Sequence, residues 1–171
     1  MIISLLGYMG SGKSHIAKIL SNELQCPLFD LDKEISAHYG KNIPEIFQEK
    51  GEIFFRKLER EVLEKILTRK KSGILSLGGG TPCYYNNMEI INQKSESIYL
   101  RANVNTLVER LYLQKEKRPL IANIPNEDLP EFIAKHLFDR NPFYNQAKYI
   151  VDTDKKTPEE IIQEISRLLT A

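Results

Sequence analysis

The chain has 171 residues, 42% hydrophobic and 27% charged, a composition that suits one well-cored globular domain and is short for two. Its 24 basic and 23 acidic residues nearly balance, which argues against a broad nucleic-acid-binding surface. No stretch approaches the roughly 20 apolar residues that span a bilayer, and no signal peptide is evident, so we expect a cytoplasmic protein without a membrane partner.

Strand-like and helix-like segments alternate along the chain. Short apolar runs, typical of strands buried on both faces of a parallel sheet, occur at 2–6, 28–31, 73–77, 97–100 and 149–151. Helical periodicity predicts helices at 13–24, 33–39, 44–50, 52–70, 86–93, 103–114, 127–140 and 158–170. The repeated units predict an α/β fold with a parallel sheet covered on both faces, and its sites are expected where the strands end.

The first strand runs into Gly7–Ser14, which matches the pattern G-x-x-x-x-G-K-[ST]. The glycines let backbone N–H groups turn towards a phosphate chain, and the helix that opens at Lys13 adds its positive end. In such a loop the lysine reaches the β- and γ-phosphates and the Ser14 hydroxyl binds Mg²⁺. Both flanks agree with the motif, so the sequence predicts a nucleoside triphosphate site. The predicted ATP contacts of this segment are Gly10, Ser11, Gly12, Lys13, Ser14 and His15.

Two carboxylates, Asp30 and Asp32, follow the second strand. Alternate residues of an extended segment point the same way, so both are expected to face one cleft. One would help to hold Mg²⁺ through water while the other accepts a proton from a substrate hydroxyl. The equally weighted alternative is that Asp32 caps the following helix.

Arg56 and Glu59 are three residues apart on a predicted helix and share a face. They form either an ordinary surface ion pair or an arginine clamp for a carboxylate, held in place by the glutamate. Phe47 and Phe55 supply either an apolar wall of the site or ordinary core side chains.

The third strand ends in Gly78, Gly79 and Gly80. Three consecutive glycines are costly in backbone entropy, which favours a close approach of a ligand over a floppy loop.

The polar, proline-punctuated segment 114–128 predicts a mobile flap. Within it, Arg118 is either a solvated loop residue or a cation that swings over the phosphates. Arg140 ends the next predicted helix, where a C-terminal cap is the ordinary interpretation. Cys26 and Cys83 lack metal-ligand spacing and are expected to be reduced thiols.

Together the segments GYMGSGKS, DLD, FRKLE, LGGGTP, KRPL and DRNPFY resemble the shikimate kinase family in order and approximate spacing, over nearly the whole chain. The resemblance implies one domain, 1–171, with a three-layer αβα P-loop kinase fold and a five-stranded parallel sheet. It also implies a helical substrate-binding region at about 32–61 and a lid at about 114–128. The implied reaction is ATP- and Mg²⁺-dependent phosphorylation of the shikimate 3-hydroxyl, in chorismate and aromatic amino acid biosynthesis.

The resemblance further implies roles for single residues. Lys13, Asp32 and Arg118 would be catalytic, with Asp32 the candidate base, and Ser14 and Asp30 would hold Mg²⁺. The implied shikimate-binding residues are Asp32, Phe47, Phe55, Arg56, Glu59, Gly78, Gly79, Gly80 and Arg140. Of these, Arg56 and Arg140 would grip the carboxylate, with Glu59 orienting Arg56.

The loop after the last strand resembles the adenine-side loop of the family, with Lys155 as the candidate nucleotide contact. Two alternatives stay open: a kinase of the same fold for a sugar acid or a nucleoside monophosphate, and an ATP-binding regulatory module without turnover. The length suits a self-contained domain, so we expect a monomer.

Overall fold

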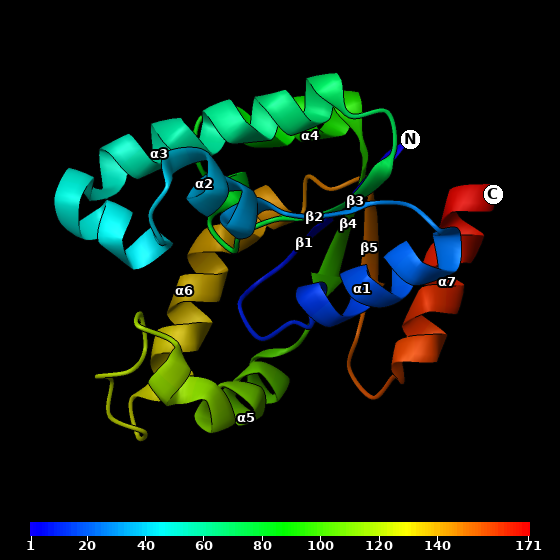
Figure 1. The fold of residues 1–171 in the computed structure, drawn as a ribbon. Helices are drawn as coiled ribbons and strands as arrows, with labels where there is room; N and C mark the ends of the chain where they lie inside the picture. The colour runs from blue at the N-terminus through cyan, green and yellow to red at the C-terminus, as the bar shows by residue number, and fades with distance from the viewer.

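A five-stranded sheet, in which every neighbouring pair is parallel, forms the centre of the computed structural model, which describes residues 1–171 (Figure 1). Across the sheet the order is β2-β3-β1-β4-β5. The strand bounds are β1 Ile2–Leu6, β2 Leu28–Asp30, β3 Gly73–Ser76, β4 Glu96–Arg101 and β5 Tyr149–Asp152. Each predicted strand is confirmed, because a buried parallel strand has a continuous apolar sequence with polar residues where it leaves the core.

Seven α-helices and two short 3₁₀ helices connect and cover the strands. Their bounds are α1 Lys13–Leu24, α2 Leu31–Tyr39, α3 Ile43–Arg69, η1 Thr81–Cys83, α4 Asn87–Lys94, α5 Val104–Gln114, η2 Lys115–Lys117, α6 Leu129–Tyr144 and α7 Pro158–Thr170. The kink in α3 lies at Gly51, with φ 83° and ψ 175°, so the break predicted between 44–50 and 52–70 is confirmed. Only glycine adopts this backbone conformation readily.

Helix α6 runs four residues beyond its predicted end at 140 and contains Pro142. The buried Tyr144 side chain holds this last turn, because its hydroxyl donates to the Gly79 carbonyl at 2.6 Å. Arg140 therefore lies inside the helix and does not form the C-terminal cap that the sequence suggested.

The sheet separates two hydrophobic cores, as the predicted three-layer arrangement requires. On one face Ile3 and Leu5 of β1 pack with side chains of α1 and α7. On the other face Ile2 and Leu6 join the larger core formed with α2 to α6. Each fully buried Leu or Ile contributes roughly 1.5–3 kcal/mol, so the alternation along β1 stabilises both layers.

The connection from β1 to β2 runs through α1 on one face of the sheet, whereas the connection from β3 to β4 runs through α4 on the opposite face. Two neighbouring strands with opposite exits open a crevice beyond their carboxyl ends. The loop after β1, helix α5 and the segment 115–128 all lie at this lower end of the sheet in Figure 1. Strand order therefore places these segments around one site.

The predicted flap is folded onto the body of the protein. Ile121 is fully buried in the larger core, and Asn126 accepts hydrogen bonds from Tyr112 Oη at 2.8 Å and Lys115 Nζ at 2.9 Å. Movement of this segment stays a prediction.

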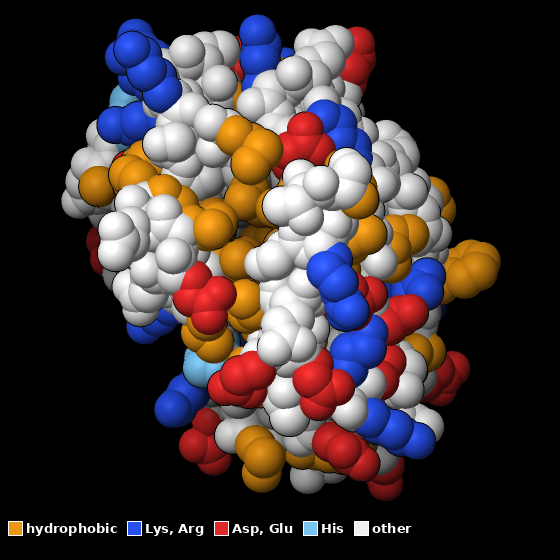
Figure 2. Space-filling model, turned by 90° about the vertical axis from the view of Figure 1, so that its right-hand side faces the viewer, with side chains coloured by type: hydrophobic (Ala, Val, Ile, Leu, Met, Phe, Trp, Pro, Cys, Tyr) orange, Lys and Arg blue, Asp and Glu red, His pale blue; other side chains and the backbone are white.

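On the face that carries α7, lysines and arginines are interspersed with aspartates and glutamates instead of forming one patch (Figure 2). None of the helices combines the length and apolarity that crossing a membrane requires. Cys26 and Cys83 are free thiols, as predicted.

Candidate active site

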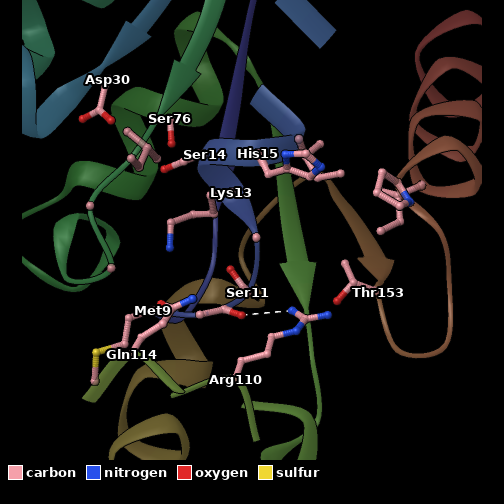
Figure 3. A pocket seen from close by; sticks show the side chains of 18 of the residues that line it. Met9, Ser11, Lys13, Ser14, His15, Asp30, Ser76, Arg110, Gln114 and Thr153 are labelled. Atoms are coloured by element: carbon pink, nitrogen blue, oxygen red, sulfur yellow. Dashed lines mark hydrogen bonds between the residues drawn. The ribbon is translucent and has the colours of Figure 1, made fainter. Parts of the chain in front are cut away.

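A cavity of about 480 Å³ lies beyond the carboxyl ends of β1 and β3 (Figure 3). This volume is within the usual range for small-molecule sites. The predicted site residues among its lining are Gly10, Ser11, Gly12, Lys13, Ser14, His15, Asp30, Asp32, Gly78, Gly79 and Arg118. Predicted residues from four separate segments of the sequence are thus brought to one cavity.

The loop after β1 is shaped to receive an anion. Gly10 and Gly12 have φ of 81° and 92°, in the left-handed region that favours glycine. Gly12 precedes α1 and has no side chain to cap it, so the first N–H groups of the helix stay available to a ligand. The Ser11 hydroxyl is buried beside them without a hydrogen-bond partner. Phosphate oxygens would satisfy these donors together.

Lys13 folds back onto the loop, where its Nζ donates to the carbonyls of Gly7 at 2.6 Å and Tyr8 at 3.1 Å. Burial, and then the positive charge of Arg118, lower the pKa of Lys13 from 10.5 to about 7. Two cations that face one cavity are stabilised by an anion placed between them. The charges of Lys13 and Arg118 and the shape of the loop therefore both favour binding of an anion in the cavity.

Asp30 and Asp32 reach the cavity in a different way from the predicted one. Asp30 ends β2 and caps α2 by accepting from Lys33 N at 3.2 Å, whereas Asp32 lies inside the first turn of that helix. The helical turn, and not an extended segment, brings both carboxylates to the same cavity. Burial and then the charge of Asp30 raise the pKa of Asp32, against the effects of Lys13 and Arg56. The Asp32 side chain is exposed and opens onto the cavity, where its carboxylate is placed to accept a proton.

The Arg56–Glu59 pair is not an ordinary surface ion pair. Arg56 Nη1 donates to Glu59 Oε1 at 3.1 Å, and the Glu59 side chain is only 1% exposed. Thr81 Oγ1 donates to the other Glu59 oxygen at 2.8 Å. Arg56 Nε is buried without a hydrogen-bond partner, so the guanidinium keeps a donor for a ligand.

The missing side chains of Gly78–Gly80 make room for three predicted site residues. A Cβ added to the first, second and third glycine would lie 3.2 Å from Asp32 Oδ1, 3.1 Å from Arg140 Nη1 and 2.8 Å from Arg56 Nη2. None of the three glycines has a positive φ, so close packing and not backbone conformation favours glycine at these positions. Asp32, Arg56 and Arg140 therefore all pack against the Gly78–Gly80 segment.

Phe55 belongs to the buried core and Phe47 packs against it, with ring centroids 4.5 Å apart. The ordinary core interpretation therefore holds for Phe55. The Arg56 Cζ atom lies 5.2 Å from the centroid of the Phe55 ring, so Phe55 borders the Arg56 guanidinium. Contact of either ring with a substrate stays a prediction.

Two predicted nucleotide contacts differ in placement. Arg118 lines the cavity and donates from Nη2 to Gln114 Oε1 at 3.0 Å. Lys155 is exposed and lies outside the lining, whereas the neighbouring Lys156 lies within it. Contact of Lys155 with a nucleotide stays a prediction.

Arg110 and Thr153 line the cavity but were not predicted. Arg110 Nη1 donates to the Gly10 carbonyl at 3.0 Å, which ties α5 to the loop (Figure 3). Thr153 directly follows β5, where sites of parallel sheets are expected, whereas Arg110 lies inside α5, the helix after β4, and no local signal in the sequence singles it out. In Figure 3 they lie at one end of the cavity, with Ser14 and Asp30 at the other.

An unpredicted pair, Tyr8 and His136, joins the loop after β1 to α6. The Tyr8 hydroxyl lies 2.8 Å from His136 Nδ1, and the two rings meet edge to face. Burial, and then the charge of Arg140, lower the pKa of His136 from 6.5 to about 4. The folded protein therefore favours the neutral imidazole.

We expect this histidine to weaken the fold in acid. A folded-state pKa below the unfolded one gives stability that is present above about pH 6.5 and lost as the pH falls towards 4. The loss should be on the order of 1 kcal/mol, because the ring is partly exposed and screened. Urea unfolding between about pH 7 and 4.5 should show a shallower decline for His136→Gln than for the wild type. Parallel declines would contradict the assignment.

Comparisons with known proteins agree with this geometry. The family model described as shikimate kinase matches residues 9–170. The shikimate kinase of Flavobacterium psychrophilum is 50% identical over 98% of both chains.

Solved structures show the same likeness. The crystal structure of the shikimate kinase of Bacteroides thetaiotaomicron has a TM-score of 0.91 and 35% identity, covering 100% of this chain and 99% of that one. The shikimate kinase of Acinetobacter baumannii in complex with shikimate has a TM-score of 0.86 and 31% identity, covering 99% and 92%. Sequence, fold and cavity lead to one conclusion, that this chain belongs to the shikimate kinase family.

Proposed function

We propose that this protein transfers the γ-phosphoryl group of ATP to the 3-hydroxyl of shikimate, giving shikimate 3-phosphate and ADP, as a step in chorismate biosynthesis. The observation that carries the proposal is the Gly78–Gly80 segment, which packs Asp32, Arg56 and Arg140 beside the phosphate-binding loop. A carboxylate grip, a proton acceptor and a triphosphate site are the groups that this reaction needs.

The two arginines would bind the carboxylate of the substrate. Arg56 offers its buried Nε, which has no hydrogen-bond partner, and Arg140 belongs to a different element, α6. Charge-assisted hydrogen bonds to a planar carboxylate fix the orientation of the ring as well as its affinity. That orientation decides which hydroxyl points towards Asp32 and the γ-phosphate.

In the transfer step, the attacking oxygen forms a bond to the γ-phosphorus while the bond to the bridging oxygen of ADP breaks. Asp32 accepts the proton that the hydroxyl loses. Lys13 and Arg118 neutralise negative charge on the transferred group. Alignment of the hydroxyl with the γ-phosphate supplies most of the remaining rate acceleration, because little covalent chemistry is required of the protein. Closure of the segment 115–128 would exclude water as a competing acceptor.

Ser14, Asp30 and Asp32 offer one hydroxyl and two carboxylates, the oxygen ligands that Mg²⁺ prefers. No cluster of three metal-ligating His, Cys, Asp or Glu side chains exists, which fits an ion held largely by water and phosphate oxygens. When bound, Mg²⁺ supplies positive charge at the β- and γ-phosphates. Ser14 and Asp30 would hold it.

The opposite end of the cavity would receive the nucleoside. Arg110 and Thr153 line that end (Figure 3), and the planar guanidinium of Arg110 is able to stack on a base. The monomeric state and the cytoplasmic location stay predictions.

ADP release in a coupled assay with Mg-ATP, with and without shikimate, tests the proposal. Quinate and gluconate serve as alternative acceptors. Strong release with shikimate alone is the expected result. Release with another acceptor would keep the kinase fold and overturn the substrate, and ATP binding without any release would favour a regulatory module.

A further inference from the structure

The aromatic ring of Tyr84 covers one face of the Arg56 guanidinium. The Arg56 Cζ atom lies 4.0 Å from the centroid of the Tyr84 ring, closer than the 5.2 Å that separates it from the Phe55 ring. Tyr84 directly follows η1, the short helix after the glycine triplet. A cation over the face of an aromatic ring at this separation is attracted by the ring electrons.

Glu52 holds the Tyr84 ring in place. The Tyr84 hydroxyl donates to Glu52 Oε1 at 2.8 Å. The same oxygen lies 3.8 Å from Arg56 Nε, too far for a hydrogen bond but close enough for charge attraction. Glu52 and Arg56 lie one turn apart on α3, so the ring, the carboxylate and the guanidinium form a closed set of contacts.

These contacts leave one edge of Arg56 free. Its face is stacked on Tyr84, Nη1 is bound to Glu59, and Nε is buried without a hydrogen bond. A guanidinium binds a carboxylate best through two parallel N–H donors in its own plane. The orientation of that plane therefore decides whether the free edge meets a carboxylate squarely.

We propose that Tyr84 is a positioning residue that fixes the plane of the Arg56 guanidinium and so sets the affinity for the substrate carboxylate. The inference rests on the proposed function, because it assigns the carboxylate to Arg56. Tyr84 does not line the nucleotide cavity, so its effect is confined to the acid-binding side of the site.

Steady-state kinetics of Tyr84→Leu, Tyr84→Phe and the control Tyr85→Phe test the proposal. Tyr84→Leu removes the stacking ring and should raise KM for shikimate about three- to thirtyfold, with kcat and KM for ATP nearly unchanged. Tyr84→Phe keeps the ring and loses only the hydroxyl, so its rise should be smaller. The Tyr85 side chain is 57% exposed, and its variant should behave as wild type.

The carboxamide analogue of shikimate separates positioning from packing. If Tyr84 acts through the carboxylate grip, Tyr84→Leu should change KM for this neutral analogue much less than KM for shikimate. Equal changes for both compounds, or an unchanged shikimate KM in a folded variant, would overturn the proposal. Should Tyr84→Leu not fold, Glu52→Ala provides a second test. The Glu52 side chain is 56% exposed, so its removal should be tolerated by the fold. The variant removes the hydrogen bond that holds the Tyr84 ring and should raise KM for shikimate about twofold or more.

The activity of the wild-type enzyme distinguishes failure of the proposed function from failure of the positioning role of Tyr84. A wild-type enzyme inactive with shikimate would contradict the proposed function. An active wild type whose Tyr84 variants keep its KM would contradict the positioning role alone.

Discussion

Asp32→Asn is expected to lower kcat by about a hundredfold to ten-thousandfold while KM for ATP changes little. Asparagine keeps the shape of the side chain but cannot accept the proton of the attacking hydroxyl. Lys13, Ser14 and the backbone of the loop remain to bind the triphosphate. Steady-state kinetics with each substrate varied in turn measure both effects.

Stability serves as the control for this variant. Burial and Asp30 raise the pKa of Asp32, which means that the folded state disfavours the charged carboxylate relative to the unfolded chain. At neutral pH the neutral amide should therefore leave the melting temperature equal to or above that of the wild type. Glu34→Gln, at a partly exposed position of the same helix that does not line the cavity, should keep full activity. Wild-type turnover by Asp32→Asn would remove this residue from the chemistry.

Arg56→Lys is expected to raise KM for shikimate about ten- to hundredfold, with a much smaller effect on KM for ATP. An ammonium group loses the planar fork that binds a carboxylate with two parallel hydrogen bonds. It also cannot stack on Tyr84 as a flat cation does. Charge-assisted hydrogen bonds are worth about 1.5–3 kcal/mol, which corresponds to this range of affinity.

Arg60→Lys is the matched control, since Arg60 lies one turn further along α3. It binds Asn86, Asn87 and Glu64 away from the cavity. Thermal unfolding of both variants is needed because the buried Glu59 loses its guanidinium partner in Arg56→Lys. An unchanged shikimate KM in a folded Arg56→Lys protein would exclude the carboxylate grip.

Much of the fold follows from local sequence patterns. Buried parallel strands need continuous apolar runs, so the five strands were predicted within one residue of their bounds. The break between the helices predicted at 44–50 and 52–70 lies at Gly51, whose positive φ interrupts the helical backbone. The last turn of α6 was not predicted, because it depends on the contact between Tyr144 and Gly79, which are distant in sequence.

The sequence predicted which residues line the candidate site more fully than it predicted how they are arranged. The chain from Gly7 to Ser14 determines its own phosphate-binding conformation, since the motif, its glycines and the following helix are all local. Asp30 and Asp32 were predicted to share a cleft, and they do so through a helical turn that sequence alternation did not reveal.

The sequence by itself determined the strand and helix order, the phosphate loop and, through the combined motifs, the family. Only the tertiary structure decided which side chains meet across the site. It showed that Gly78–Gly80 make space for Asp32, Arg56 and Arg140, and that Lys156 lines the cavity in place of Lys155. It also revealed Tyr84 stacked on Arg56. The physical reason is that helices and strands depend on the spacing of apolar and polar residues close together in the sequence, which can be read locally. Packing between distant segments depends on side-chain shapes that meet only in the folded protein, and no local pattern reports it.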